Sequence, residues 1–288
     1  MKWFLFLLVI LLIALILQAI ELTRFTISGY ELTCPKLQNS HCFAVVTDLH
    51  GFSYGEGNIR LLAAIRQCQP DGILLAGDLT VAGKKWTQER AYEFLTQTAA
   101  IAPVYYGLGN HESRDLHSSN PLHARRMADY LDRVRALGVT ILDNTSILVQ
   151  DKEDNFVISG LSLPLSYYKK GRNIPLEEGL ITESIGKSSR DATQILIAHN
   201  PTYSKEYAAW GADLTVCGHY HGGLVRVPGV GSLISPQLTL FPKYDAGMYS
   251  FGERSVLVSR GLGTHRFHVR IFNRAELLCV TVKPASKK

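Results

Sequence analysis

Five short polar blocks, each at the end of an apolar run, hold the residues of this chain that are best suited to chemistry. They supply carboxylate, imidazole and amide groups without thiolate, a donor set that suits manganese, iron or zinc rather than a closed structural zinc site. Together they predict the ligands of a two-metal hydrolase. The blocks, in chain order, are Asp48-Leu49-His50, Gly77-Asp78, Gly109-Asn110-His111-Glu112, Ala198-His199-Asn200 and Gly218-His219-Tyr220-His221.

Each block follows a short apolar segment that we expect to form a buried strand. Ligands of open α/β sheets bind outside the carboxyl ends of the strands, so blocks that are distant in the sequence can converge there. In the pairs Asp48/His50 and His219/His221, an extended backbone would place both side chains on one face. The expected strands are Phe43 to Thr47, Ile73 to Ala76, Val104 to Gly107, Gln194 to Ala198 and Leu214 to Cys217.

In this order the blocks resemble the calcineurin-like metallophosphoesterases, whose pattern is D-x-H, G-D, G-N-H-[DE], a lone His and G-H-x-H. The tail from Val258 to Gly263 resembles the closing segment of the membrane-tethered or exported bacterial phosphodiesterase branch of that family. The resemblance implies an α/β fold, a four-layer α-β-β-α sandwich of two mixed sheets flanked by helices. It also implies two divalent metal ions as cofactors.

The family pattern gives each matching residue a role. The resemblance implies that the first metal is held by Asp48, His50, Asp78 and His221. It implies that the second is held by Asp78, Asn110, His199 and His219, with Asp78 as the bridge. A metal-bridging hydroxide would then attack the phosphorus, and His111 would protonate or stabilise the leaving oxygen as the catalytic residue.

One position departs from the family pattern. Many members carry G-D-x-x-D, where the second Asp can orient the His of the G-N-H block, but this chain has Val81 at that position. The sequence therefore leaves open how His111 is held, although the metal ligands are unaffected.

Length and composition are those of one large domain. The chain has 288 residues, of which 46% are hydrophobic, enough to bury a substantial core. Helical spacing of apolar residues alternates with the expected strands, which favours a β-sandwich flanked by helices over residues 41–288. The expected helices are Ile59 to Gln67, Trp86 to Ala100 and Ala124 to Leu137, and two later strands are Val256 to Ser259 and Leu277 to Val282.

The amino terminus is an apolar run from Trp3 to Ile20 that is long enough to span a bilayer. We expect residues 1–22 to be a transmembrane anchor and residues 23–40 to be a juxtamembrane segment. A cleaved signal peptide is the alternative, but its apolar region usually has about 7–15 residues, and Leu17-Gln18-Ala19 is a poor cleavage site. The flanking charges favour an amino terminus inside and a catalytic domain outside the cytoplasm.

The cysteines and the net charge do not decide the cellular compartment or the binding partner. Cys34 and Cys42 could form a disulfide in an exported protein, but the sequence favours free buried or juxtamembrane thiols. The net charge is +5, and the one concentrated basic stretch runs from Tyr167 to Arg172, in a segment that we expect to form a loop near the site. No basic stripe interleaved with aromatic residues is visible, which argues against a nucleic acid partner.

These observations predict a membrane-anchored phosphohydrolase that cleaves a phosphodiester or pyrophosphate bond, with an envelope or lipid-linked substrate as its partner. One alternative is a UDP-diacylglucosamine-type pyrophosphatase, which would face the cytoplasm. An alternative of another class is a metal-binding membrane scaffold with weak or no catalysis. The scaffold is less favoured because every ligand position of the family pattern is filled.

Overall fold

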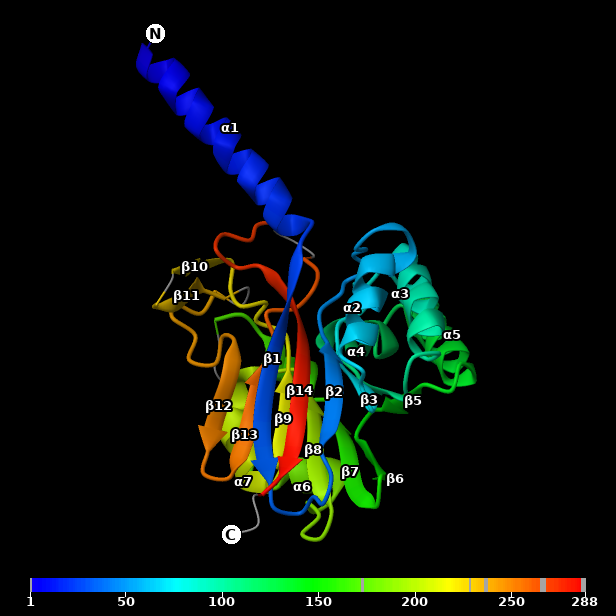
Figure 1. Cartoon of the computed structure of the whole chain (residues 1–288). Coiled ribbons are helices and arrows are strands. Elements are labelled where there is room, and N and C mark those ends of the chain that lie inside the picture. Colours follow the sequence, from blue (N-terminus) through cyan, green and yellow to red (C-terminus); the bar gives the residue numbers. More distant parts are fainter. Residues whose placement is uncertain (1, 172–173, 228, 236–237, 265–267, 286–288) are drawn as a thin grey trace.

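The computed structural model describes residues 2–171, 174–227, 229–235, 238–264 and 268–285, and these form two six-stranded sheets (Figure 1). The first sheet has the order β1-β14-β2-β3-β4-β5 and the second has the order β12-β13-β9-β8-β7-β6. The first comprises β1 (Phe25–Cys34), β14 (Ala275–Pro284), β2 (His41–Val46), β3 (Gly72–Ala76), β4 (Val104–Gly107) and β5 (Thr140–Leu142). The second comprises β12 (Gly247–Phe251), β13 (Arg254–Val258), β9 (Leu214–Cys217), β8 (Thr193–Ala198), β7 (Asp154–Leu161) and β6 (Thr145–Asp151).

Both sheets are mixed, as expected. Strands β2 to β5 are parallel to one another, while β14 runs antiparallel to β2. In the second sheet β7, β8, β9 and β13 are parallel, and the outer strands β6 and β12 are antiparallel to their neighbours. The polar blocks follow parallel strands, so within each sheet they all lie at the carboxyl ends of the strands.

Three buried clusters separate four layers. Alternation along β2 sends Ala44 and Val46 to a cluster under the helices of the first sheet, and Phe43 and Val45 to a cluster between the two sheets. A third cluster lies between the second sheet and its own helices. The first sheet is covered by α2 (Ile59–Gln67), α3 (Lys85–Thr98), α4 (Asn110–Leu116) and α5 (Pro121–Ala136), and the second by α6 (Leu180–Ile185) and α7 (Ser204–Trp210). The four-layer prediction is confirmed.

Local signals explain most of these elements. Helix α2 occupies the residues expected from its apolar spacing, and it buries Leu61, Leu62 and Ile65. Helix α5 starts earlier than expected because Asn120 caps it, its side chain accepting a bond from Leu122 N, and Pro121 fits the first turn. The remaining short elements are η1 (Glu56–Asn58), η2 (Leu165–Tyr168), η3 (Pro201–Tyr203) and the two-stranded pair β10 (Val225–Val227) and β11 (Gly231–Ile234).

The segment 23–40, expected to be a juxtamembrane connection, contains β1. This strand pairs in parallel with β14 along its whole length, from Phe25 beside Ala275 to Cys34 beside Pro284. Both strands cross the molecule together, so the folded domain includes residues before 41. The pairing partner lies some 250 positions away in the chain, which local sequence patterns cannot reveal.

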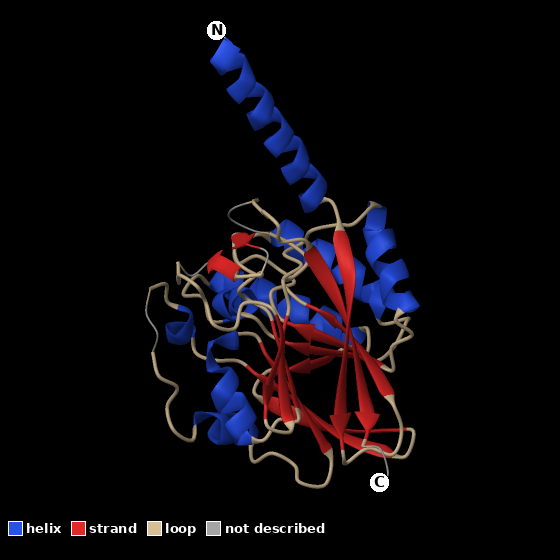
Figure 2. Cartoon of the chain, turned by 60° about the vertical axis from the view of Figure 1, so that its left-hand side comes forward, coloured by secondary structure: helices blue, strands red, loops and turns tan. Residues whose placement is uncertain are grey.

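The helix α1 (Lys2–Leu22) leads into β1. It has 21 residues and a mean hydropathy of 3.0, which makes it long and apolar enough to cross a membrane. Figures 1 and 2 show it projecting away from both sheets. Its last turn is tied to the domain by an ion pair of 2.7 Å between Glu21 and Arg274.

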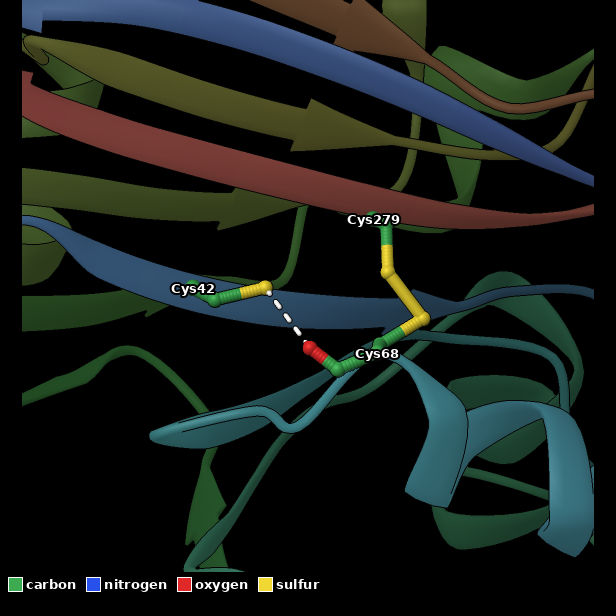
Figure 3. Close-up of a disulfide and its surroundings, with 3 residues drawn as sticks. All are labelled: Cys42, Cys68 and Cys279. Atoms are coloured by element: carbon green, nitrogen blue, oxygen red, sulfur yellow. Dashed lines mark hydrogen bonds between the residues drawn. A yellow bond between two sulfur atoms is a disulfide. The ribbon is translucent and has the colours of Figure 1, made fainter.

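The disulfide joins a different pair of cysteines from the one considered in the sequence. Cys68, at the end of α2, is bonded to Cys279 in β14 (Figure 3). Cys34 and Cys42 are free, and the Cys42 thiol lies 3.3 Å from the Cys68 carbonyl oxygen. The Cys34–Cys42 pairing is therefore wrong, because β1 and β2 are separated in the sheet by β14.

Because the Cys68–Cys279 bond closes a loop of 211 residues, it should restrict the unfolded chain strongly. We expect Cys279→Ala to lower the free energy of unfolding of the oxidised protein by about 2–5 kcal/mol, measured by urea denaturation. Cys42→Ala is the matched control, and it should keep the wild-type response to a reductant. A wild-type stability that does not change on reduction would contradict the assigned bond.

Candidate metal centre

The five polar blocks meet at the carboxyl ends of five parallel strands. Asp48 follows β2, Asp78 follows β3, and Asn110 with His111 opens helix α4 after β4. In the second sheet His199 follows β8, and His219 and His221 follow β9. The structure thus brings all eight predicted site residues together at the strand ends. Seven of them are buried, and His219 is partly exposed.

The backbone at Asp48/His50 and His219/His221 is not extended, so the expectation that an extended strand places each pair on one face is wrong. Asp48, His50, Asp78, His219 and His221 all have positive φ, between 50° and 68°. Such a left-handed conformation costs about 1–2 kcal/mol per residue, and it is typical of positions that serve function. In each of the pairs Asp48/His50 and His219/His221, two residues with left-handed backbone turn the chain and bring the side chains together. Alternation of side chains along an extended strand is not the cause.

Two glycines leave room for the Asp48 and Asp78 carboxylates to pack directly against the backbone of neighbouring loops. A Cβ atom at Gly109 would overlap the Asp78 carboxylate, and one at Gly218 would overlap the Asp48 carboxylate. Any side chain at either position would therefore displace a predicted metal ligand. This explains why glycine is the first residue of both polar blocks.

The first group of ligands contains Asp48, His50 and His221. Asp48 Oδ1 lies 3.4 Å from His221 Nε2 and 3.9 Å from His50 Nε2. The two Nε2 atoms are 3.3 Å apart, and their rings are stacked. These three atoms surround a volume suited to one cation.

The second group contains Asp78, His199 and His219. Asp78 Oδ2 lies 3.1 Å from His199 Nε2, and His199 Nε2 is 3.8 Å from Asp48 Oδ1. Asn110 Oδ1 is buried and has no hydrogen-bond partner. The same Asp78 carboxylate also reaches the side of the first group, because its Oδ2 lies 4.0 Å from His111 Nε2 and a His50–Asp78–His111 cluster forms there.

Backbone carbonyls set the tautomers of three of the histidines. His50 Nδ1 lies 3.1 Å from Thr80 O, His199 Nδ1 lies 2.6 Å from Ala76 O, and His221 Nδ1 lies 3.2 Å from Gly263 O. A carbonyl oxygen can only accept, so each Nδ1 carries the proton and each Nε2 directs a lone pair into the site. Lone pairs of His50 and His221 that face each other at 3.3 Å repel unless a positive charge lies between them.

The electrostatics of the site also call for cations. Burial raises the pKa of Asp48 to about 6, since a charged carboxylate loses its hydration there. Burial would also raise the pKa of Asp78, but His199 and His111 together hold it well below its usual value. Burial opposes protonation of His199, yet Asp78 and Asp48 raise its pKa to about 10. Without metal, His199 carries the positive charge that this pair of carboxylates requires.

The donor set therefore fits two divalent ions. Buried oxygen and nitrogen ligands converge in two groups, Asp78 of the second group also clusters with His50 of the first, and Asn110 Oδ1 is buried without a hydrogen-bond partner. The donors are carboxylate, imidazole and amide, which suits manganese, iron or zinc.

A backbone amide takes the place of the missing second Asp. The Ala82 N–H donates to His111 Nδ1 at 2.9 Å, immediately after Val81. His111 therefore carries its proton on Nε2 when neutral, and this nitrogen faces the Asp78 carboxylate across the site. Burial lowers the pKa of His111, which favours this neutral form. The orientation left open by the sequence is supplied by the main chain.

Glu112 has a structural role that the sequence did not assign. Its buried carboxylate accepts bonds from Asp78 N, Thr80 N, the Thr80 hydroxyl, Gly109 N and the Tyr106 hydroxyl. It thereby joins the loops after β3 and β4 beneath the metal ligands. The Glu three residues after Gly109 at the start of a helix was the available signal, since this spacing closes a capping interaction.

A second support comes from the segment before β14. Asn273 Nδ2 donates to His221 O at 2.7 Å and to Gly223 O at 2.6 Å. The buried Arg270 donates to Gly263 O at 2.9 Å, the same carbonyl that faces His221 Nδ1. These residues lie some 50 positions after His221 in an irregular segment, so no local pattern pointed to them.

The loop from Leu161 to Ile181 reaches the site, as expected. Tyr168, in η2, packs edge-on against His219 with ring centroids 5.0 Å apart, and it lies 6.2 Å from the His199 ring. Lys169 and Lys170 are exposed, and Arg172 lies outside the described residues. The loop thus places the Tyr168 ring against His199 and His219 of the second ligand group.

Comparison with known proteins agrees with this geometry. The chain matches the family model described as calcineurin-like phosphoesterase over residues 43–223. It is 26% identical over 196 residues to Phosphodiesterase YaeI of Escherichia coli (strain K12), covering 68% of this chain and 64% of that protein. It is 22% identical over 264 residues to a transmembrane protein with metallophosphoesterase domain of Danio rerio, covering 87% and 55%. The chain thus spans less than two thirds of the length of these relatives.

Among solved structures, the chain is similar to a 5'-nucleotidase precursor from Thermus thermophilus. The two share 16% sequence identity with a TM-score of 0.46, and the match covers 85% of this chain and 54% of that one.

The two-sheet fold and the clustered predicted metal ligands at its strand ends agree with the metallophosphoesterase class. The chain belongs to the calcineurin-like phosphoesterase family.

Glu112→Gln should destabilise the fold, because an amide group would meet main-chain N–H groups that now donate to a carboxylate. We expect the free energy of unfolding to fall by about 1–3 kcal/mol, measured by urea denaturation. Glu89→Gln is the matched control, since Glu89 is exposed and pairs with Arg133 at 3.1 Å. Equal stability of the two variants would contradict the supporting role of Glu112.

His111→Ala should lower kcat while leaving metal content unchanged, because His111 faces the site without belonging to the two ligand groups. We expect a fall of roughly 10²–10³-fold, as for removal of one transition-state hydrogen-bond donor. The exposed His117, after helix α4, provides the control His117→Ala. Loss of bound metal in His111→Ala, measured by elemental analysis, would instead make His111 a ligand.

Proposed function

We propose that the protein is a membrane-anchored phosphohydrolase of the exported bacterial branch, and that it cleaves phosphodiester or pyrophosphate bonds with two divalent ions. The observation that carries this proposal is the position of Asp78, whose carboxylate clusters with His199 and His219 of the second group and also with His50 of the first. Two cations held there would face one phosphoryl group. Asp48, His50, Asp78 and His221 would hold the first ion. Asp78, Asn110, His199 and His219 would hold the second.

When bound, two such ions would supply a water of lowered pKa as the nucleophile and would neutralise charge on the phosphoryl oxygens. The chain's own contribution is orientation. Carbonyl acceptors fix the ligating Nε2 atoms, Glu112 holds the loops, and burial excludes bulk water. His111 Nε2, whose proton is set by the Ala82 amide, would donate a hydrogen bond to the leaving oxygen.

The helix α1 and the disulfide support a membrane-bound, extracytoplasmic placement. The helix is apolar along its length and lies outside the domain core. Disulfides such as Cys68–Cys279 persist mainly in oxidising compartments outside the cytoplasm. A relative from Danio rerio is named as a transmembrane protein, which is consistent with anchoring in this family. An envelope or lipid-linked phosphoester is the substrate that such a placement offers.

The cytoplasmic pyrophosphatase acting on a UDP-diacylglucosamine-type substrate is the second candidate. It shares the metal centre and the helix with the first, but a domain on that side of the membrane would keep its cysteines reduced. A topology reporter fused after Lys288 separates the two. A cytoplasmic signal would favour the second candidate.

The direct test uses the full chain in detergent, stripped of metal and assayed on a soluble chromogenic phosphodiester and on a phosphomonoester. We expect manganese, zinc or iron to restore hydrolysis, and Asp78→Asn to abolish it, because the shared ligand is lost. Asp129→Asn, on the exposed face of α5, is the control and should keep full activity. Binding of two ions per chain with no hydrolysis of either ester would favour the scaffold and overturn the proposal.

A further inference from the structure

Exposed apolar side chains gather at the end of the domain from which α1 emerges. Among the described residues outside α1, more than half of the exposed large hydrophobic side chains belong to one surface, with exposed fractions from 37% to 73%. This surface, the apolar rim, consists of Val227, Val230, Leu238, Leu240, Phe241, Val269, Ile271 and Phe272. Exposed apolar groups in such number on one face mark an interaction site.

Backbone contacts make the rim continuous. Val227 ends β10, Val230 directly precedes β11, and β10 is bridged to Ile271 through Val225. On its other side, β11 is bridged to Leu240 through Ile234, and Phe241 N donates to Leu233 O. Three segments that are separate in the sequence therefore form one surface.

The rim adjoins the point where α1 leaves the domain. Gln18, in the last turn of α1, accepts a bond from Arg270 N at 3.3 Å and donates to His268 O at 3.4 Å. Both contacts lie beside Val269 and Ile271. Figures 1 and 2 show β10 and β11 at the same end as α1 and far from β6. A bilayer that holds α1 would lie directly over this surface.

The rim is also joined to the metal centre. Strand β10 begins four residues after His221, and Asn273, next to Phe272, donates to His221 O at 2.7 Å. Arg270, between Val269 and Ile271, donates to the carbonyl of Gly263 that faces His221. A membrane bound by the rim would therefore lie at a fixed position relative to the predicted metal ligands.

We propose that the apolar rim docks on the bilayer that α1 crosses, so that the metal centre faces the headgroup layer and acts on phosphoesters of membrane amphiphiles. The charge at its border suits an anionic surface, because Arg24 and Lys243 are exposed beside apolar residues. This inference rests on the proposed function, both for the membrane anchor α1 and for the substrate. The docking itself requires no catalysis.

Accessibility of spin labels tests the docking in the full chain. The chain, with Cys42→Ala, is placed at one copy per lipid nanodisc, and a nitroxide is attached at Phe272→Cys or Leu240→Cys. Leu148→Cys is the matched control, since Leu148 is 67% exposed on the distant edge strand β6. We expect collisions with a water-soluble nickel chelate to be at least about fivefold rarer at 272 and 240 than at 148, because interfacial side chains are buried among acyl chains.

Equal nickel accessibility at the three positions would overturn the docking. Protection that appears only when two chains share a disc would also overturn it, because a second copy would then cover the rim. Neither result depends on whether the enzyme is active, so this measurement separates failure of the docking from failure of the proposed function.

Activity provides a second readout. The double variant Leu240→Ser, Phe272→Ser should lower hydrolysis of a phosphodiester embedded in vesicles by at least about tenfold relative to a soluble phosphodiester, since only the former requires the bilayer contact. Leu148→Ser should leave this ratio unchanged. An unchanged ratio in the double variant would contradict the link between the rim and the substrate.

Discussion

Two buried carboxylates, those of Asp48 and Asp78, both approach His199 Nε2, and their charge must be balanced by cations. Most of the features around them follow from this requirement. Glycines give them room, five left-handed residues turn the chain around them, and carbonyl oxygens direct histidine nitrogens at the same volume. The strain of these turns is tolerated because two packed sheets fix the strand ends from which they start. Metal binding then stabilises a site that would otherwise contain repelling groups.

The sequence predicted the parts of this arrangement that depend on short-range patterns. The blocks with Asp48, His199 and His221 follow apolar runs that are strands in the structure, and α2 occupies the residues expected from its spacing. The four-layer architecture followed from the family resemblance. The partners of these elements could not be predicted, because pairing of β1 with β14, or of Cys68 with Cys279, depends on contacts across the whole chain.

The residues that support the predicted metal ligands could not be predicted from the sequence either. Ala82 orients His111 through its main-chain N–H, which every residue except proline carries, so no side-chain pattern reports it. Asn273 and Arg270 act on His221 and on the carbonyl that faces it from an irregular segment. The sequence thus specifies what the site contains more clearly than what holds it, since ligand chemistry restricts residue type and support from the backbone does not.

The most direct test of the account is whether two ions share one carboxylate. The full chain can be loaded with manganese(II) and its electron paramagnetic resonance spectrum recorded as the ion is titrated. Because Asp78 clusters both with His199 of the second ligand group and with His50 of the first, we expect a spectrum of two exchange-coupled ions once two equivalents are bound. A spectrum of isolated ions at every ratio, or saturation at one ion per chain, would contradict the shared-carboxylate centre on which the account rests.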